Sequence, residues 1–138
     1  MAERIKDVVT GKIVVSIANP LNESYDGLAT EPTTSAAEEL SKLLPHSTIV
    51  KAFNTVFGAD FDSPVISGKM VDCFVAGDDE RGVATVAELV KDAGFNPVLA
   101  GKLSVSRTLE QMMVLLIGLT MKNNYNWLAG WKVLHRMA

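Results

Sequence analysis

Two apolar, β-branched runs constrain the fold of this chain more than any other feature. The first, Lys12-Ile-Val-Val-Ser-Ile-Ala, ends at Asn19-Pro20, and the second, Thr48-Ile-Val-Lys-Ala-Phe, ends at Asn54-Thr55. Pro20 has no amide hydrogen to give to a sheet, so the first strand must stop before it. Both runs are mostly apolar rather than alternating, which is typical of strands that are covered on both faces.

The segment between the two runs predicts a helix. Ser35-Ala-Ala-Glu38 is a capping box, in which the serine hydroxyl and the glutamate side chain satisfy each other's backbone amides. Leu40, Leu43 and Leu44 follow at helical spacing before Pro45 stops the helix. Strand, helix and strand over this length predict a parallel crossover unit, so both strands should end at the same edge of the sheet.

The rest of the chain continues the alternation of strands and helices. We expect strands at residues 70–76 and 96–100, a helix at residues 80–93, and a long helix at residues 104–122. At 138 residues the length predicts a single domain, 1–138. Within it, residues 1–103 form an α/β part and residues 104–138 a carboxyl-terminal helical segment.

Composition excludes several classes of function. The formal net charge is −3 and the basic residues are scattered, which argues against nucleic acid and anionic membranes as partners. The charged amino terminus lacks the apolar core of a signal peptide, and the most apolar run, residues 112–120, is much shorter than the roughly 20 residues of a spanning helix. We therefore expect a cytoplasmic protein. The single cysteine, Cys73, lies in an apolar run and is expected to be buried.

The inventory of side chains is poor for acid–base or nucleophilic catalysis. No catalytic triad and no metal-ligand cluster is recognisable, so we predict no catalytic side chain and no metal site. The carboxylate pairs Glu38-Glu39 and Asp78-Asp79 stand at helix starts, where they favour the positive end of the helix dipole. Arg107 and Glu110, three apart on a helix, are interpreted as a surface pair.

The polar residues at the strand ends are better candidates for a site. Ligands of open α/β sheets bind outside the carboxyl ends of the strands. Asn19 and Asn54 each carry a donor and an acceptor, which could orient a planar heterocycle that bears a carboxamide. Phe53 could offer an apolar wall and Thr55 a hydroxyl. The alternative is that both asparagines only close turns, for which asparagine is well suited.

A set of motifs in a fixed order resembles a known family. The motifs are Gly11-Lys-Ile-Val-Val, Asn19-Pro20, Ser35-Ala-Ala-Glu38, Val50-Lys-Ala-Phe-Asn-Thr55, Val75-Ala-Gly-Asp-Asp79, Ala93-Gly-Phe95, Ala100-Gly-Lys-Leu103 and Arg107-Thr-Leu-Glu110. Together they resemble the NADP oxidoreductases that use the deazaflavin coenzyme 8-hydroxy-5-deazaflavin, and the related reductase domains of metalloreductases. One departure is the segment Ser16-Ile-Ala-Asn-Pro20, where the family usually has Asp-x-Thr-Asn-Pro.

The resemblance implies a fold, a cofactor and a site. The fold is the second half of a Rossmann-like parallel sheet with a long carboxyl-terminal helix. The cofactor is NADP, and the reaction is hydride transfer between NADPH and a deazaflavin or similar small-molecule acceptor. The long helix, residues 104–122, takes part in a homodimer. The residues that border the nicotinamide and the hydride acceptor are Asn19, Pro20, Ala52, Phe53, Asn54 and Thr55.

The amino-terminal half that carries the phosphate-binding turn of the family is not found. No G-x-G-x-x-G motif occurs in the 138 residues. We therefore expect a truncated form that binds NADPH weakly unless a partner supplies the other half, and whose activity as an enzyme is open. Two alternatives remain: a non-enzymatic dimerising or binding module derived from this fold, and a binder of another planar ligand. The free edge of the first strand also favours assembly into homo-oligomers.

Overall fold

The computed structural model describes residues 1–137 and contains a four-stranded sheet in the order β1-β2-β5-β6. A separate two-stranded hairpin, β3 and β4, precedes β5. The strands are β1 (Ile13–Ser16), β2 (Thr48–Lys51), β3 (Val65–Ile66), β4 (Lys69–Met70), β5 (Asp72–Gly77) and β6 (Asn96–Gly101). The α/β class and the predicted strand positions are confirmed, and β6, with its Pro97, is an edge strand as expected.

Two of the three strand pairings in the sheet are parallel. β1 pairs with β2 in parallel, and β5 pairs with β6 in parallel, but β2 and β5 run in opposite directions. The carboxyl ends of β1 and β2 therefore lie at one edge of the sheet, and those of β5 and β6 lie at the other. We call the first edge, formed by residues 18–20 and 52–55, the asparagine rim.

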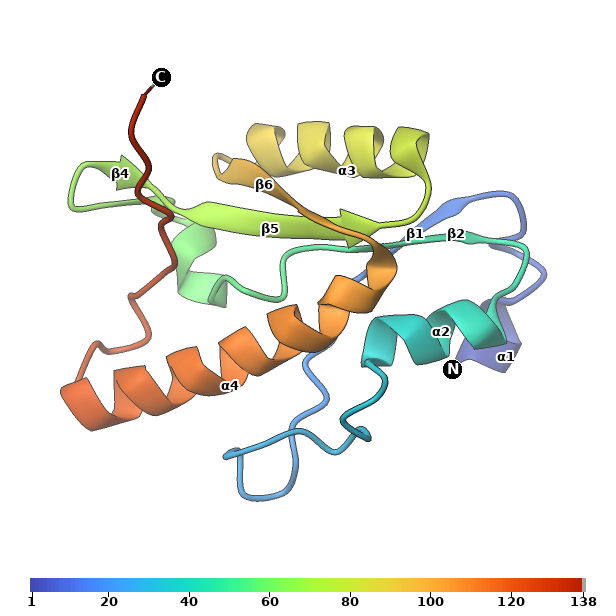
Figure 1. Ribbon diagram of the computed structural model, residues 1–138, viewed down its shortest axis with the longest axis horizontal. Helices are drawn as coiled ribbons and strands as arrows, with labels where there is room; N and C mark the ends of the chain where they lie inside the picture. The colour runs from blue at the N-terminus through green and yellow to red at the C-terminus, as the bar shows by residue number, and fades with distance from the viewer. Residues whose placement is uncertain (138) are drawn as a thin grey trace.

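Helices cover both faces of this sheet. In Figure 1, α3 lies over one face, while α2 and α4 lie under the other. The helices are α1 (Ala2–Ile5), α2 (Ala36–Leu43), α3 (Glu80–Asp92) and α4 (Ser106–Asn123), with short 3-10 turns η1 (Gly58–Phe61) and η2 (Leu103–Val105). Residues 104–138 were predicted as a helical segment, but α4 ends at Asn123 and residues 124–137 after it are not helical.

Local sequence explains where these helices begin. The Ser35 hydroxyl accepts a hydrogen bond from the Glu38 amide at 3.1 Å, so the predicted cap at Ser35 is confirmed. The reciprocal half of the capping box is not formed, because the Glu38 carboxylate accepts from the Ser35 hydroxyl instead of the Ser35 backbone amide. The Asp79 carboxylate caps α3 by accepting from the Gly82 amide at 2.8 Å. Such caps satisfy amides that the first helical turn leaves without partners.

The hydrophobic core is divided by the sheet. On the α3 face, Val86 and Val90 pack with Val50, Val75 and Cys73, which is fully buried as predicted. On the other face, the α2 cluster is built on Ala37, Leu44 and Ile49, and the α4 cluster on Phe74, Ala76 and Leu109. Burial raises the pKa of the Cys73 thiol to about 11, so this side chain is a neutral core group.

The carboxyl-terminal tail returns to the first residue of β5. The backbone amide of Asp72 donates to the Trp131 carbonyl at 2.9 Å. The Asp72 side chain, itself 1% exposed, accepts from the Val133 amide at 2.6 Å, from Lys132 Nζ at 2.9 Å and from Asn96 Nδ2 at 2.8 Å. The tail is therefore fastened to the sheet by the backbone amide and the buried carboxylate of Asp72.

Among the described residues, no helix combines the length and the apolar character that crossing a bilayer would require.

Candidate functional site at the asparagine rim

The two predicted strand-end asparagines meet at the asparagine rim. Asn19 Nδ2 donates to the backbone carbonyl of Asn54 at 3.1 Å, and Asn54 Nδ2 donates to Asn19 Oδ1 at 3.1 Å. The parallel register, with Ser16 opposite Lys51, places the two residues at equivalent distances beyond their strands. The expectation that both strands end at a shared edge is confirmed.

Asn54 is the buried centre of this site. Its side chain is 1% exposed, and Nδ2 makes a second hydrogen bond to the Leu109 carbonyl of α4 at 2.9 Å. Both amide hydrogens are therefore used, but Asn54 Oδ1 has no hydrogen-bond partner among the described residues. The hydroxyl of the neighbouring Thr55, also fully buried, likewise has none. Buried polar atoms normally have partners, so these two atoms are candidates for binding a ligand.

Phe53 has an unusual backbone conformation. Its φ is 65°, in the left-handed region that side chains with a Cβ rarely adopt. Its ring packs on Phe61, with centroids 5.7 Å apart, and Phe61 packs edge-on against Phe95 at 5.0 Å. The sharp turn at Phe53 separates the extended strand end at Ala52 from the side chain of Asn54.

Ala52 and Pro20 complete the set of predicted site residues. Ala52 is fully buried, and its amide extends the ladder by donating to the Ser16 carbonyl at 3.3 Å. The Pro20 carbonyl accepts from the Ala29 amide at 2.7 Å and so fixes the loop that leaves the rim. The six predicted residues therefore lie on two adjacent segments, one after β1 and one after β2.

Beside the rim lies a buried ion pair that the sequence analysis missed. Lys51 Nζ is 2.8 Å from Glu110 Oε2, and both side chains are 0% exposed. Lys51 Nζ also donates to the Ala18 carbonyl at 2.6 Å. Glu110 Oε1 accepts from the Ala36 amide at 2.8 Å, at the first turn of α2. Burial lowers the pKa of Lys51, and Glu110 opposes this shift by stabilising the charged form.

The interpretation of Arg107 and Glu110 as a surface pair is wrong. Arg107 reaches across to α2 and holds both carboxylate oxygens of Glu38, at 2.7 and 2.9 Å. Glu110 faces the sheet instead of solvent. The sequence does indicate that Glu110 is buried, because it lies between Leu109 and Met113 in the apolar stripe of α4. A charged side chain on a buried face usually has a partner of opposite charge.

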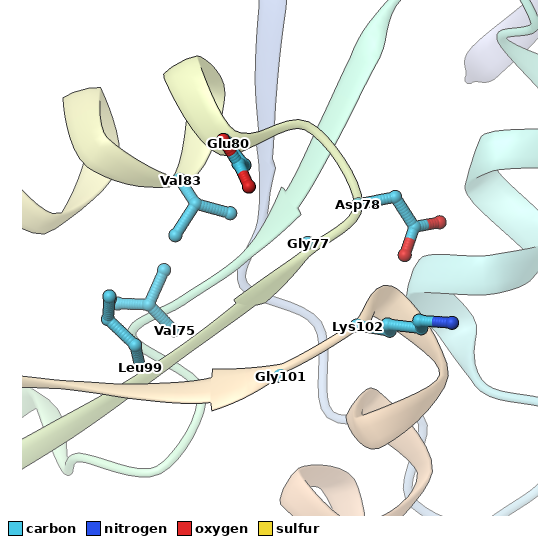
Figure 2. Close-up of a pocket in the computed structure, with 8 residues that line it drawn as sticks. All are labelled: Val75, Gly77, Asp78, Glu80, Val83, Leu99, Gly101 and Lys102. Carbon is cyan, nitrogen blue, oxygen red and sulfur yellow. The ribbon is translucent and has the colours of Figure 1, made fainter.

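A second pocket lies at the opposite edge of the sheet, where β5 and β6 end. Figure 2 shows Asp78 and Lys102 on the loops after these strands, with Val75, Val83 and Leu99 forming an apolar side. The Asp78 carboxylate is engaged by the Leu103 amide at 2.9 Å. No group of three metal-ligating side chains is found within residues 1–137.

By sequence and by fold, this chain is similar to proteins named as F420-dependent NADP reductases, and the resemblance seen in its motifs is confirmed. The F420-dependent NADP reductase of Methanocaldococcus jannaschii is 35% identical over 128 residues, which is 87% of this chain and 56% of the relative. The metalloreductase STEAP3 of Rattus norvegicus is 29% identical over 113 residues, 82% of this chain and 22% of the relative.

Solved structures agree with these relatives. A protein of Arthrobacter sp. FB24 with a provisional assignment as an F420-dependent NADP reductase superposes with a TM-score of 0.79 and 29% identity, over 86% of this chain and 56% of that protein. A hypothetical protein of Sinorhizobium meliloti gives a TM-score of 0.63 and 30% identity, over 76% and 55%. No family profile matches the chain. The chain thus spans about half the length of the F420-dependent relative, 56%.

Proposed function

We propose that this chain contributes the nicotinamide end of the active site in an NADPH-dependent reductase that passes hydride to a deazaflavin or a similar acceptor. The observation that carries the proposal is the pair of buried acceptor and hydroxyl atoms without partners, Asn54 Oδ1 and Thr55 Oγ1, at the rim where two parallel strands end. The likeness to F420-dependent NADP reductases supports the choice of cofactor and reaction.

The residues at the rim fit a nicotinamide. The N–H of the nicotinamide carboxamide can donate a hydrogen bond to Asn54 Oδ1, which has no other partner. The carbonyl of the carboxamide can accept one from the Thr55 hydroxyl. Asn19 and Leu109 hold the side chain of Asn54, so its free oxygen has a fixed direction. A preoriented acceptor of this kind lowers the entropic cost of binding.

The chemistry needs little from protein side chains. A reduced nicotinamide supplies the hydride when it is bound. The residues of this chain orient the ring and exclude water, which matches the absence of a recognisable acid–base pair in the sequence. We therefore expect substitutions at Asn54 and Thr55 to weaken binding and misplace the ring rather than to shift a pH optimum.

The proposal assigns only one end of the cofactor to these residues. The G-x-G-x-x-G turn that holds a pyrophosphate is not in the sequence, and the Methanocaldococcus relative is longer than the part matched here. Reduced nicotinamide mononucleotide, which keeps the nicotinamide end, should therefore bind weakly, in the millimolar range of about −4 kcal/mol. Adenosine 2′,5′-bisphosphate, which keeps the other end, should not bind.

NMR titration of the ¹⁵N-labelled chain tests this assignment. We expect the reduced mononucleotide to shift the side-chain amide of Asn54 and the backbone amide of Thr55, and we expect the variant Asn54→Ala to lose these shifts. The adenosine compound is the matched control. Shifts confined to the pocket around Asp78 and Lys102, or no shifts at all with the mononucleotide, would contradict the proposal and favour a binding module without this chemistry.

We also propose that the chain self-associates through the outer face of α4. This face exposes Leu115 and Met121, at 54% and 65%, around Gly118, and Tyr25 from the loop lies beside it. Exposed apolar surface of this kind is typical of interfaces. Sedimentation should show a dimer that Leu115→Glu dissociates, whereas Val8→Glu, at a site 69% exposed on another part of the chain, leaves it intact. A monomeric wild-type chain would refute the interface.

A further inference from the structure

The function proposed above assigns no role to the buried ion pair of Lys51 and Glu110. Both side chains are fully buried, and each contacts backbone groups as well as its partner. Removing two charges from water is costly, and apolar pairs of similar volume are often as stable or more stable. Stability alone is therefore a weak reason for placing this pair in the core.

The contacts of the pair converge on the asparagine rim. Lys51 holds the carbonyl of Ala18, the residue directly before Asn19. Glu110 follows Leu109, whose carbonyl accepts from Asn54. Because Lys51 and Glu110 are joined at 2.8 Å, the ends of β1 and β2 are tied to the same turn of α4.

We infer that Lys51 is a positioning residue, which sets the orientation of Asn19 and Asn54 by holding the Ala18 carbonyl and Glu110 together. The consequence for a ligand rests on the proposed function, but the positioning itself concerns only residues of this chain. The first turn of α2 shares in the arrangement, since the Ala36 amide donates to Glu110 at 2.8 Å. Without Lys51, the loop that carries Asn19 loses the charged contact with β2 that the Ala18 carbonyl accepts.

A double variant separates positioning from stability. Lys51→Met alone leaves a buried carboxylate without its cation, so we expect a large loss of stability. Lys51→Met with Glu110→Gln removes both charges and keeps an acceptor for the Ala36 amide. This double variant should recover most of the lost stability.

The readouts are the side-chain amide resonances of Asn19 and Asn54 and the affinity for reduced nicotinamide mononucleotide. If Lys51 positions the rim, the folded double variant shows displaced amide resonances and an affinity lowered about tenfold. Wild-type resonances and wild-type affinity in the double variant would overturn the inference. If the mononucleotide does not bind the wild-type chain, the proposed function is refuted. The amide resonances of Asn19 and Asn54 then test by themselves whether Lys51 positions the rim.

A second variant covers the case in which the first does not fold. Lys51→Met with Glu110→Met makes the pair fully apolar, at nearly constant side-chain length, and is judged by the same two readouts. If this variant also fails to fold, the ion pair is a requirement of folding, and the inference of a positioning role is overturned.

Discussion

Asn54 fastens α4 to the end of β2 through a single hydrogen bond, 2.9 Å long, from its side-chain amide to the carbonyl of Leu109. The same amide bonds to Asn19. We expect Asn54→Ala to lower the free energy of unfolding by about 1–3 kcal/mol, because buried partners lose a donor, and Asn19→Ala by about 0.5–1.5 kcal/mol. Urea denaturation of both single variants and the double variant measures the coupling, expected at 0.5 kcal/mol or more, about the lower limit for residues in contact. Additive effects would contradict the contact.

Asn54→Asp sharpens this test. An ionised aspartate has no donors, so it would face the Leu109 carbonyl and Asn19 Oδ1 with acceptors only. We expect this variant to be less stable than Asn54→Ala at pH 7 and to recover as acid protonates the carboxyl, which can then donate. Equal stability of the two variants at neutral pH would show that the amide hydrogens of Asn54 contribute little.

The left-handed backbone at Phe53, with φ of 65°, predicts that glycine is more stabilising than alanine at this position, the reverse of the usual order. Phe53→Gly and Phe53→Ala both remove the ring, but only glycine adopts this conformation without strain. The glycine variant should therefore be the more stable by about 1 kcal/mol. Val65, an exposed strand residue outside the left-handed region, is the control, where alanine should be the more stable. Thermal unfolding of the glycine and alanine variants at Phe53 and Val65 tests this order. If alanine were more stabilising than glycine at both positions, the prediction would be refuted.

The Asp72 clamp predicts a loosening of the tail in acid. Burial raises the pKa of Asp72, but hydrogen bonds from the Val133 amide, Lys132 and Asn96 outweigh it and leave the pKa below the ordinary 3.8 of an aspartate. A depressed pKa gives stabilisation that is complete above the ordinary value and is lost as pH falls through the folded value. The clamp should therefore hold at neutral pH and weaken below about pH 4.

Tryptophan fluorescence reports this loosening selectively, because the chain's two tryptophans, Trp127 and Trp131, both lie in the tail. The wild-type emission should shift to longer wavelength in an acid transition, before the far-ultraviolet circular dichroism changes. Asp72→Asn should show the shifted emission already at pH 7, whereas the exposed control Asp7→Asn behaves as wild type. If Asp72→Asn still showed the acid-induced emission shift, groups other than Asp72 would be responsible for the transition.

Two glycines on helices should respond to alanine in opposite directions. A Cβ on Gly82, in α3, would come within 2.7 Å of Thr48 Cγ2, whereas a Cβ on Gly118, in α4, would meet nothing within 4 Å. Gly118→Ala should therefore stabilise by about 0.5–1 kcal/mol, the usual helix preference. Gly82→Ala should destabilise by about 1–3 kcal/mol, because α3 must move off the sheet. Denaturation at several protein concentrations separates any contribution of self-association at Gly118 from the helix preference. If the two alanine substitutions changed the free energy of unfolding equally, the described packing of α3 on the sheet would be contradicted.

Local chemistry made much of the fold predictable. The β-branched run that ends at Asn54 and the helix cap at Ser35 each depend on residues close together in the chain, and both are found where expected. Parallel pairing of β1 and β2 followed from the crossover between them. The direction of β5 did not follow, because residues 52–71 contain a 3-10 turn and a hairpin rather than a crossover helix, and hydrophobic patterning does not encode strand direction.

The candidate site was predictable in part for the same reason. Asn19 and Asn54 stand at strand ends that the sequence marks clearly. Lys51 and Glu110, in contrast, are 59 residues apart, and each lies in an apolar pattern that it interrupts. The local spacing of Glu110 from Arg107 suggested a surface pair, and only the packing of α4 on the sheet shows that the two side chains point to different partners.

The opposed directions of β2 and β5 separate the molecule's two polar edges by the length of the sheet. β5 has six residues, so at a rise of about 3.3 Å per residue its first and last residues are about 17 Å apart. A compound seated between Asp78 and Lys102 would thus not reach the asparagine rim. If the proposed function holds, inhibition by such a compound would be noncompetitive with the nucleotide, and both could occupy one chain simultaneously.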